Sequence, residues 1–324
     1  MQYLAFYAGA TWRLVWLLRR GDVVVALTDP PALSVPIAFA AGVKRALLVN
    51  WLQDVFPEVA TQLGVRIPGA RLLTVLRDWS LRRAAVNVVV SPSMGRHVET
   101  AGVDSARVEV IPNWADDESI HPIQPDSTPL RAEWGLEGRF VAEYSGNMGR
   151  AHEFETILDA AEQLQREPDV AFLFIGGGPA APWVRQRVEQ KGLTNVLFKP
   201  PQPRAGLVEA LAVGDVHLVC LRPALEGLVV PSKYYGVLAA GRPVIYVGGR
   251  ASDIAREVLD RQCGRVVSPG DAPSLAAAIL SLRDCASERA RLGSNARNLL
   301  DERYTRRAAL DRWQGLLAAL DAHS

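Results

Sequence analysis

The stretch RFVAEYSGNMGRAHEFETILDAAEQLQ, residues 139–165, predicts a β-strand, a tight turn and an α-helix in succession. Its first residues are apolar and partly β-branched, as in a buried strand, and its last residues repeat apolar side chains at helical spacing. Between them, Gly146 and Gly149 allow a tight backbone turn. The free N–H groups at a helix start suit a phosphate, so this turn is either an anion site or a plain connection. Three polar residues accompany it: Asn147, Arg150 and His152.

The alternation of strand and helix continues in both directions. Upstream, apolar runs predict strands at residues 22–29, 45–54, 85–92 and 107–114, with helices at 3–20, 33–42, 70–84 and 93–102. Downstream, strands are predicted at residues 170–178, 195–199, 216–222 and 243–248. Because most strands are nearly continuous apolar runs, the pattern predicts parallel sheets covered on both faces. The fold class is therefore α/β, with two Rossmann-like, doubly wound domains.

A linker separates the two halves. Residues 115–130 carry three prolines and several acids without periodicity, which is typical of a connection. We therefore predict an N-terminal domain over residues 1–122 and a C-terminal domain over residues 123–303. Gly42 and Gly102 are expected to end their helices.

Composition excludes several classes of protein. The formal net charge of +1 over 324 residues argues against a nucleic-acid binder held by bulk charge. Cys220, Cys263 and Cys285 show no metal-ligand spacing, and they fit a reduced, cytoplasmic setting. No apolar run reaches the roughly 18 residues that a membrane span needs, and the start of the chain lacks a signal-peptide pattern.

Residues 3–20 predict an unusually apolar helix. Aromatic and aliphatic side chains cover most of it, and Arg13, Arg19 and Arg20 are its only charges. Such a helix is either buried in a domain or lies in a membrane interface, and both can hold for different faces.

The turn after the strand at residues 170–178 contains a second group of glycines. Gly176, Gly178 and Ala181 formally match a dinucleotide-binding pattern. The next strand ends in Lys199, however, where a ribose-binding acid would be required. We therefore disfavour a nicotinamide-dependent enzyme.

The stretch VVPSKYYGVLAAGRPVI, residues 229–245, places a lysine at a helix start. Pro231 suits the first turn, which puts Ser232 and Lys233 there as well. A cation at a helix start is disfavoured by the helix dipole. The position of Lys233 is therefore explained if its ammonium group and the free N–H groups of the helix bind the same anion. The alternative is a solvated lysine.

Two carboxylates follow a buried strand in the first domain. Asp54 and Glu58 are four residues apart and share one face if the segment is helical. They could bind or deprotonate an acceptor hydroxyl, or they could cap a helix, and the sequence leaves both readings open.

Together, the motifs YSGNMGRAHEFETILDAAEQL, FIGGGP, VVPSKYYGVLAAGRPVI and QDVFPEVA resemble the family 4 glycosyltransferases of GT-B fold. The most similar branch builds bacterial capsule, colanic-acid and O-antigen polysaccharides. The resemblance covers the whole chain, and it implies two domains that face a central cleft. It also implies that the last helix, residues 304–324, returns to the N-terminal domain.

The resemblance implies retaining transfer of a hexosyl or N-acetylhexosaminyl group from a nucleotide-sugar, expected to be UDP-linked. The acceptor would be a hydroxyl, expected on a polyprenyl-linked saccharide at the inner face of the cytoplasmic membrane. Neither a metal ion nor a cofactor would be needed. Asp54, Glu58 and Lys233 are the predicted catalytic residues. The donor would contact Gly146, Asn147, Gly149, Arg150, His152, Gly176, Gly178, Pro201, Gln202, Glu226, Pro231, Ser232 and Lys233.

The chain departs from the family pattern in three places. Asn147 and His152 stand where an Arg and a Lys usually hold the diphosphate, with Arg150 as a substitute. The usual second Glu of a pair is replaced by Tyr234, or by Gly236 if the Ala-Gly-Arg-Pro run sets the alignment. The N-terminal domain is also expected to be incomplete, since its usual first strand and Gly-rich loop are not evident. The alternative functions are a non-catalytic nucleotide-sugar-binding or partner-binding protein and a sugar-nucleotide epimerase.

Overall fold

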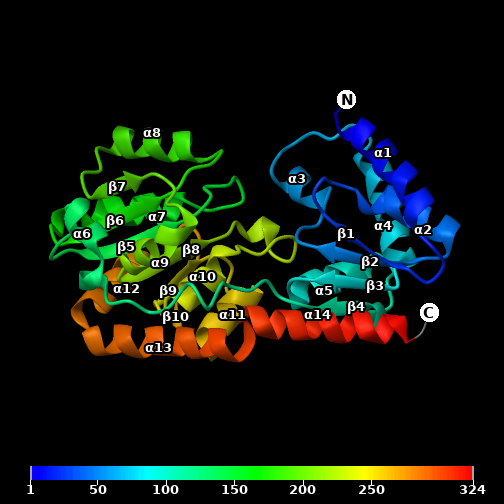
Figure 1. The fold of residues 1–324 in the computed structure, drawn as a ribbon. Coiled ribbons are helices and arrows are strands. Elements are labelled where there is room, and N and C mark those ends of the chain that lie inside the picture. Colours follow the sequence, from blue (N-terminus) through cyan, green and yellow to red (C-terminus); the bar gives the residue numbers. More distant parts are fainter. Residues whose placement is uncertain (1, 323–324) are drawn as a thin grey trace. The chain divides into compact units, whose positions relative to one another are not determined.

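The structure is a computed structural model that describes residues 2–322, and the side chains of residues 5–322. The chain forms two compact units (Figure 1). The first is built from the chain up to Pro112, from Ala224–Val230 and from Arg307 onward. The second comprises Asn113–Pro223 and Pro231–Arg306. Residues 113–122, predicted with the first domain, belong to the second unit, where the Ala115 N–H donates to Tyr304 O at 3.2 Å.

The first unit is a four-stranded parallel sheet in the order β1-β2-β3-β4. Its strands are β1 (Val23–Leu27), β2 (Leu47–Leu52), β3 (Val86–Val89) and β4 (Val108–Val110). Its helices are α1 (Gln2–Leu17), α2 (Ser34–Lys44), α3 (Glu58–Gln62), α4 (Ala70–Arg83), α5 (Pro92–Thr100) and α14 (Arg306–Asp321). Apolar residues of α1, α2 and β2 form one core cluster. A second cluster joins the sheet to α14. Val49 of β2, Val88 of β3 and Ile111, which follows β4, pack there with Trp313 and Leu316 of α14. The sheet is thus covered on both faces, as predicted.

Two predicted helix ends have different outcomes. The prediction that Gly42 ends its helix is wrong, because α2 continues to Lys44 and Arg45 takes the left-handed conformation at φ 56°. The Arg45 N–H donates to Ala41 O and Gly42 O, which satisfies the last carbonyls of the helix. Gly102 does follow α5, at φ 81°.

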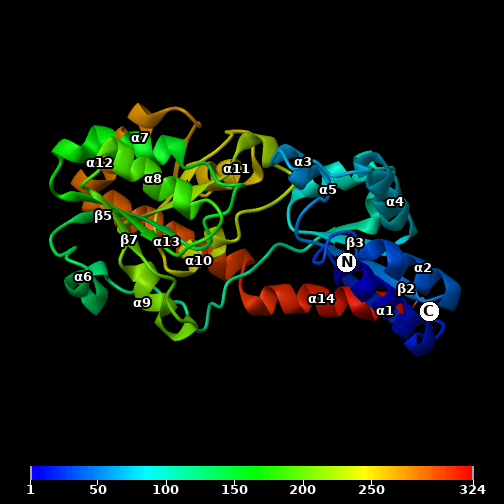
Figure 2. The ribbon, with the colours of Figure 1, turned by 90° about the horizontal axis from the view of Figure 1, so that it is seen from above.

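The second unit is a six-stranded parallel sheet in the order β10-β9-β8-β5-β6-β7. Its strands are β5 (Phe140–Ser145), β6 (Val170–Ile175), β7 (Val196–Lys199), β8 (Val216–Cys220), β9 (Val244–Val247) and β10 (Gly264–Val267). Its helices are α6 (Pro129–Glu133), α7 (Glu155–Gln163), α8 (Ala181–Lys191), α9 (Leu207–Ala212), α10 (Lys233–Ala239), α11 (Asp253–Asp260), α12 (Ala272–Asp284) and α13 (Ala286–Arg303). Figure 2 shows α7, α8 and α12 along one face of this sheet and α6 and α9 along the other.

The strand order places a switch point between β5 and β8. The chain runs from β5 outward through β6 to β7, then crosses to β8 and continues outward through β9 to β10. Loops leaving the carboxyl ends of β5 and β8 therefore turn in opposite directions, and such a point is where open parallel sheets bind ligands. Among residues 2–322, no helix is both long and apolar enough to cross a bilayer.

Candidate functional site

The two glycine turns of the second unit pack directly against each other at the switch point. The Gly146 N–H donates to Ile175 O at 2.9 Å, and the Met148 N–H donates to Gly177 O. A Cβ at Gly176 would collide with Gly146 O, and a Cβ at Gly178 would collide with Asn147 Oδ1. Both glycines have a φ that side chains rarely adopt, 127° and 139°. The glycines are therefore required by contact between the turns, whether or not a nucleotide lies beside them.

Lys233 lies at the centre of a partly buried cluster in this unit, in which Tyr144 is fully buried and Lys233 and His152 are partly exposed. Its Nζ donates to the Tyr144 hydroxyl at 2.7 Å and lies 3.1 Å from His152 Nε2. It also lies 4.4 Å from the centroid of the Tyr144 ring. The alternative of a solvated lysine is thus wrong. Tyr144 ends the buried part of β5, His152 follows the first glycine turn, and Lys233 opens α10, so three elements converge on one ammonium group.

The histidine of this cluster has a defined role. His152 Nδ1 lies 2.9 Å from Cys220 O, and since a carbonyl only accepts, this nitrogen carries the proton. His152 Nε2 is then an acceptor for Lys233. Burial, and then the charge of Lys233, lower the His152 pKa to about 4, so the ring is neutral at physiological pH. His152 therefore cannot replace a diphosphate-binding cation while it supports Lys233.

Burial also acts on the lysine and the tyrosine. Removing the ammonium group from water lowers the Lys233 pKa to about 8. Burial raises the Tyr144 pKa well above its usual range, so its hydroxyl stays protonated and donates to Asn147 O at 2.9 Å. The cluster thus holds one cation that is mostly charged at neutral pH and is kept in place by two uncharged groups.

The start of α10 differs slightly from the prediction. The helix begins at Lys233, because the Tyr234 N–H bonds back to Pro231 O in a tighter turn. Ser232 is the N-cap residue; it makes no side-chain capping hydrogen bond and its side chain is exposed. Pro231 is buried. Ser232 and Lys233 therefore lie side by side at one end of the helix, with different surroundings.

The N-terminus of α7 is less open than the sequence suggests. The Glu153 carboxylate accepts a hydrogen bond from the Thr156 N–H at 3.2 Å. One of the backbone amides that were expected to bind a phosphate is therefore already bonded to a side chain of the protein. Asn147 and Arg150 are exposed beside this turn, and Gly149 lies close to the Asn147 and His152 side chains. Pro201 and Gln202 follow β7, where the Gln202 side chain donates to Pro200 O at 3.0 Å. Contact of these residues with a donor stays a prediction.

In the first unit, Asp54 lies at the carboxyl end of β2 beside the end of β1. Burial, and then the nearby Asp29, raise the Asp54 pKa, while a hydrogen bond with Thr28 opposes the rise. The neighbouring backbone is fixed, since the Val55 N–H donates to Leu228 O at 2.9 Å. A half-buried carboxylate with a raised pKa is suited to accept a proton or a hydrogen bond from a hydroxyl.

Glu58 has different surroundings from Asp54. It starts α3, whereas Asp54 precedes that helix, so the segment is not helical at Asp54 and the two carboxylates do not share a helix face. The buried Arg77 guanidinium contacts the Glu58 carboxylate at 2.5 and 3.2 Å. Although burial opposes it, hydrogen bonds with His97 and Arg77 lower the Glu58 pKa to about 2. Glu58 is therefore a weak base held in an ion pair, and Arg77 is a partner that the sequence did not reveal.

Glu226 lies in Ala224–Val230, which packs with the first unit rather than with the second. The same segment contributes Gly227, at φ 75°, which lies close to Ser93 of α5. The predicted contact of Glu226 with the donor sugar stays a prediction.

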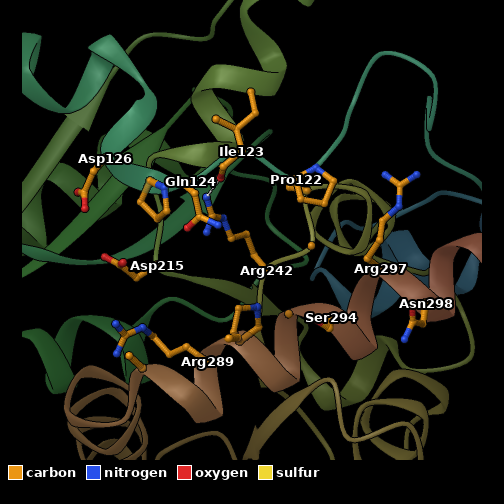
Figure 3. A pocket seen from close by; sticks show the side chains of 17 residues that line it. Pro122, Ile123, Gln124, Asp126, Asp215, Arg242, Arg289, Ser294, Arg297 and Asn298 are labelled. Atoms are coloured by element: carbon orange, nitrogen blue, oxygen red, sulfur yellow. Dashed lines mark hydrogen bonds between the residues drawn. The ribbon is translucent and has the colours of Figure 1, made fainter.

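A separate cavity of about 490 Å³ lies elsewhere on the second unit. Its lining includes Asp215 and Arg242, which precede β8 and β9, so it borders the amino ends of these strands. Figure 3 shows Asp126, Asp215 and Arg289 on one side of it and Arg297 and Asn298 on the other. This edge is opposite to the one that bears Lys233. Within the described chain, His, Cys, Asp and Glu side chains nowhere form a group of three or more that could hold a metal ion.

Two family models match the chain in the order of its two units. The model described as "Glycosyl transferase 4-like domain" matches residues 2–114. The model described as "Glycosyl transferases group 1" matches residues 139–284. The first covers the sheet that bears Asp54, and the second covers β5 to β10 with the Lys233 cluster.

Among curated proteins, the chain is similar to the probable glycosyltransferase WbjE of Pseudomonas aeruginosa. The two are 30% identical over 314 residues, which cover 94% of this chain and 76% of that protein. The putative colanic acid biosynthesis glycosyl transferase WcaI of Escherichia coli is 30% identical over 210 residues, which cover 62% of this chain and 51% of that protein.

Solved structures share the fold. HepE of Anabaena, crystallised in complex with UDP, matches with a TM-score of 0.78 at 19% identity over 97% of this chain and 82% of that one. Its complex with UDP and glucose matches with a TM-score of 0.80. Together with the family models and WbjE, these matches show that the chain belongs to the family 4 glycosyltransferases of GT-B fold.

Proposed function

We propose that the chain is a retaining glycosyltransferase that moves a sugar from a UDP-sugar to a hydroxyl of a lipid-linked saccharide during bacterial surface polysaccharide synthesis. The observation that carries this proposal is the ammonium group of Lys233, held by Tyr144 and His152 at the switch point of the donor-side sheet. A diphosphate is the part of the donor that needs a fixed cation, because its negative charge grows as the sugar leaves.

In this proposal the donor binds to the second unit and Asp54 of the first unit serves the acceptor. The bond between the anomeric carbon and the β-phosphate oxygen breaks, and a bond from that carbon to the acceptor oxygen forms. UDP leaves with the bonding electrons, and the hydroxyl proton passes to Asp54 or to the departing phosphate. Lys233 stabilises the charge on the leaving group, so neither a metal ion nor a cofactor is required.

The choice of substrates rests on the relatives. HepE binds UDP and UDP-glucose, which supports a UDP-linked hexose or N-acetylhexosamine as the donor. WcaI is assigned to colanic acid biosynthesis and another relative is an O-antigen chain mannosyltransferase, which supports a polysaccharide acceptor. Such acceptors are carried on polyprenyl lipids at the inner face of the cytoplasmic membrane, where we place the chain.

The proposal is tested by calorimetry with UDP, GDP and their sugars, in the presence and absence of EDTA. Binding of a UDP-sugar that EDTA leaves unchanged is the expected result. Product analysis by NMR should then show that the transferred sugar keeps the anomeric configuration of the donor. Binding without turnover on any lipid-linked saccharide would favour a non-catalytic nucleotide-sugar-binding protein, and an absence of binding would refute both functions.

A further inference from the structure

The cavity of about 490 Å³ on the second unit has walls built from three segments of the chain. They are residues 122–126, the turn at residues 240–243 that precedes β9, and the face of α13 between Ala286 and Asn298. All three segments belong to the second unit. Figure 3 shows the Arg242 side chain in the middle of the lining residues. The volume is within the usual range of sites that bind small molecules.

Hydrogen bonds between the segments hold the walls of the cavity in place. Arg297 of α13 donates to Ala239 O at 3.0 Å, next to the turn. Arg242 of the turn donates to Ile123 O in the third segment. The cavity is therefore shaped by the packing of the unit itself, as is usual for sites that bind small molecules.

The acids that line the cavity are paired with a base outside its lining. Arg131 contacts the Asp215 carboxylate at 2.6 Å and the Asp126 carboxylate at 3.2 Å. By contrast, Arg242 and Arg289 form no ion pair within the described part of the chain, and their hydrogen bonds go to backbone carbonyls. The lining therefore presents two guanidinium groups that no carboxylate of the protein neutralises.

The surroundings of Arg242 point the same way. Burial lowers the pKa of Arg242, and the nearby Asp215 and Glu143 oppose this shift. Asp215 is already bonded to Arg131, however, and burial raises the pKa of Glu143 well above its usual range, so the Glu143 carboxyl is uncharged at neutral pH. A guanidinium group that is partly removed from water and lacks a charged partner is stabilised by an anion.

The lining also provides neutral polar groups. The side chains of Gln124, Ser294 and Asn298 are exposed, and none of them takes part in a hydrogen bond with another described residue. Amide and hydroxyl groups both donate and accept, so they suit the hydroxyl groups of a sugar. The cavity thus combines cationic groups with groups that recognise hydroxyls.

We propose that this cavity binds a small ligand that carries both a phosphate group and hydroxyl groups, of the class of sugar phosphates, at a site separate from the donor site. The planar guanidinium groups of Arg242 and Arg289 suit phosphate oxygens, which they can bind through paired hydrogen bonds. The site borders the amino ends of β8 and β9, whereas Lys233 lies at the opposite edge of the sheet. Both ligands can therefore be bound at the same time.

This binding site goes beyond the transfer reaction and is measured without an acceptor. The test is calorimetry of the full chain with inorganic phosphate, glucose 1-phosphate and glucose, each with UDP at a saturating concentration. We expect glucose 1-phosphate to bind with a Kd of about 1 mM or lower, and glucose to bind at least about tenfold more weakly. Binding of neither phosphate compound at about 10 mM would overturn the proposal.

Two variants locate the ligand. Ser294→Phe places a ring in the cavity without removing a hydrogen bond, and it should weaken glucose 1-phosphate by about tenfold or more because the ring clashes with the ligand. Arg289→Gln should weaken it by about 10- to 150-fold, because a charge-assisted contact is lost. Circular dichroism should show that both variants keep the fold.

Matched controls separate this site from the rest of the surface. Ser281→Phe on α12 and Arg166→Gln are at exposed positions outside the lining, so both should bind glucose 1-phosphate within about twofold of the parent protein. Lys233→Met should also retain this binding, measured without UDP. A Ser294→Phe variant that binds like the parent would overturn the proposal. So would a loss of binding in Lys233→Met, since the sugar phosphate would then occupy the donor site.

Discussion

Lys233 Nζ lies 3.1 Å from His152 Nε2, and the histidine in turn is fixed by its contact with Cys220 O at 2.9 Å. Because the Tyr144 hydroxyl takes a second N–H of the ammonium group, the described contacts leave one N–H for a ligand. The two supporting groups are uncharged, so they orient the cation without neutralising it. This arrangement accounts for a lysine at a helix start, where the dipole alone would disfavour it.

The state of Lys233 predicts a pH dependence of donor binding. Burial lowers its pKa to about 8, and only the charged form attracts a diphosphate. A bound diphosphate stabilises the protonated form of Lys233. The affinity for the diphosphate is therefore highest below a pH of about 8, and it falls by up to about tenfold per pH unit above that value. Calorimetry of UDP binding across this range measures the slope. Lys233→Arg should bind with a flatter profile, whatever its absolute affinity, and an unchanged slope in that variant would contradict the assignment.

The packing of the glycine turns predicts which glycines tolerate a side chain. Gly176→Ala and Gly178→Ala should each lower the free energy of unfolding by about 2–4 kcal/mol, because the Cβ meets backbone or Asn147 atoms at a φ that favours glycine. Gly177→Ala is the matched control, since no atom lies within 4 Å of its Cβ. Urea unfolding of the three variants compares them. Equal stability of all three would show that the turns do not pack as described.

Asp54 should affect turnover more than donor binding. Its pKa is raised by burial and by Asp29, so it can take a proton that Asn could not. Asp54→Asn is expected to lower kcat by about a hundredfold or more while the Kd for UDP changes by less than about threefold. Steady-state kinetics and calorimetry give the two numbers. A parallel loss of both would place Asp54 on the donor side instead.

Glu58 should affect stability instead. Its ion pair with the buried Arg77 lowers its pKa to about 2, so Glu58→Gln should cost about 1.5–3 kcal/mol of unfolding free energy at neutral pH. The sign follows from the lowered pKa: the contribution is present above the ordinary value of 4.5 and is lost as the pH falls toward 2. Urea titrations at neutral and acid pH measure this. A variant as stable as the parent at neutral pH would contradict a structural role.

The fold was predictable because its signals are local. The apolar strand at residues 140–145, the glycine turn after it and the helical spacing that follows are each read within a few residues. The end of α2 was misplaced because Arg45 supplies the left-handed conformation that Gly42 was expected to supply. Glycine adopts the left-handed conformation most readily, but in this chain the helix continues past Gly42 and Arg45 adopts that conformation instead.

The candidate site was only partly predictable. Lys233 and His152 were identified from their motifs, yet their contact joins residues 81 positions apart and no local pattern encodes it. Tyr144 was missed because an aromatic residue in a buried strand is usually plain core. The same limit explains Glu58, whose partner Arg77 lies 19 residues further along the chain. Only the long-range hydrogen bonds of the structure distinguish residues that support the site from residues that face a ligand. The sequence motifs do not make this distinction.

The most direct test of the account compares UDP binding by Lys233→Met with that of the parent protein and of Lys191→Met. Lys191 is the matched control, since it is paired with Asp159 at 2.8 Å on α8 and α7, away from the switch point. Calorimetry near neutral pH should show that Lys233→Met binds UDP about 10- to 150-fold more weakly, as expected for a lost charge-assisted contact. Lys191→Met should bind like the parent. Equal affinity of Lys233→Met and the parent would contradict a diphosphate site at Lys233, and with it the proposed mechanism.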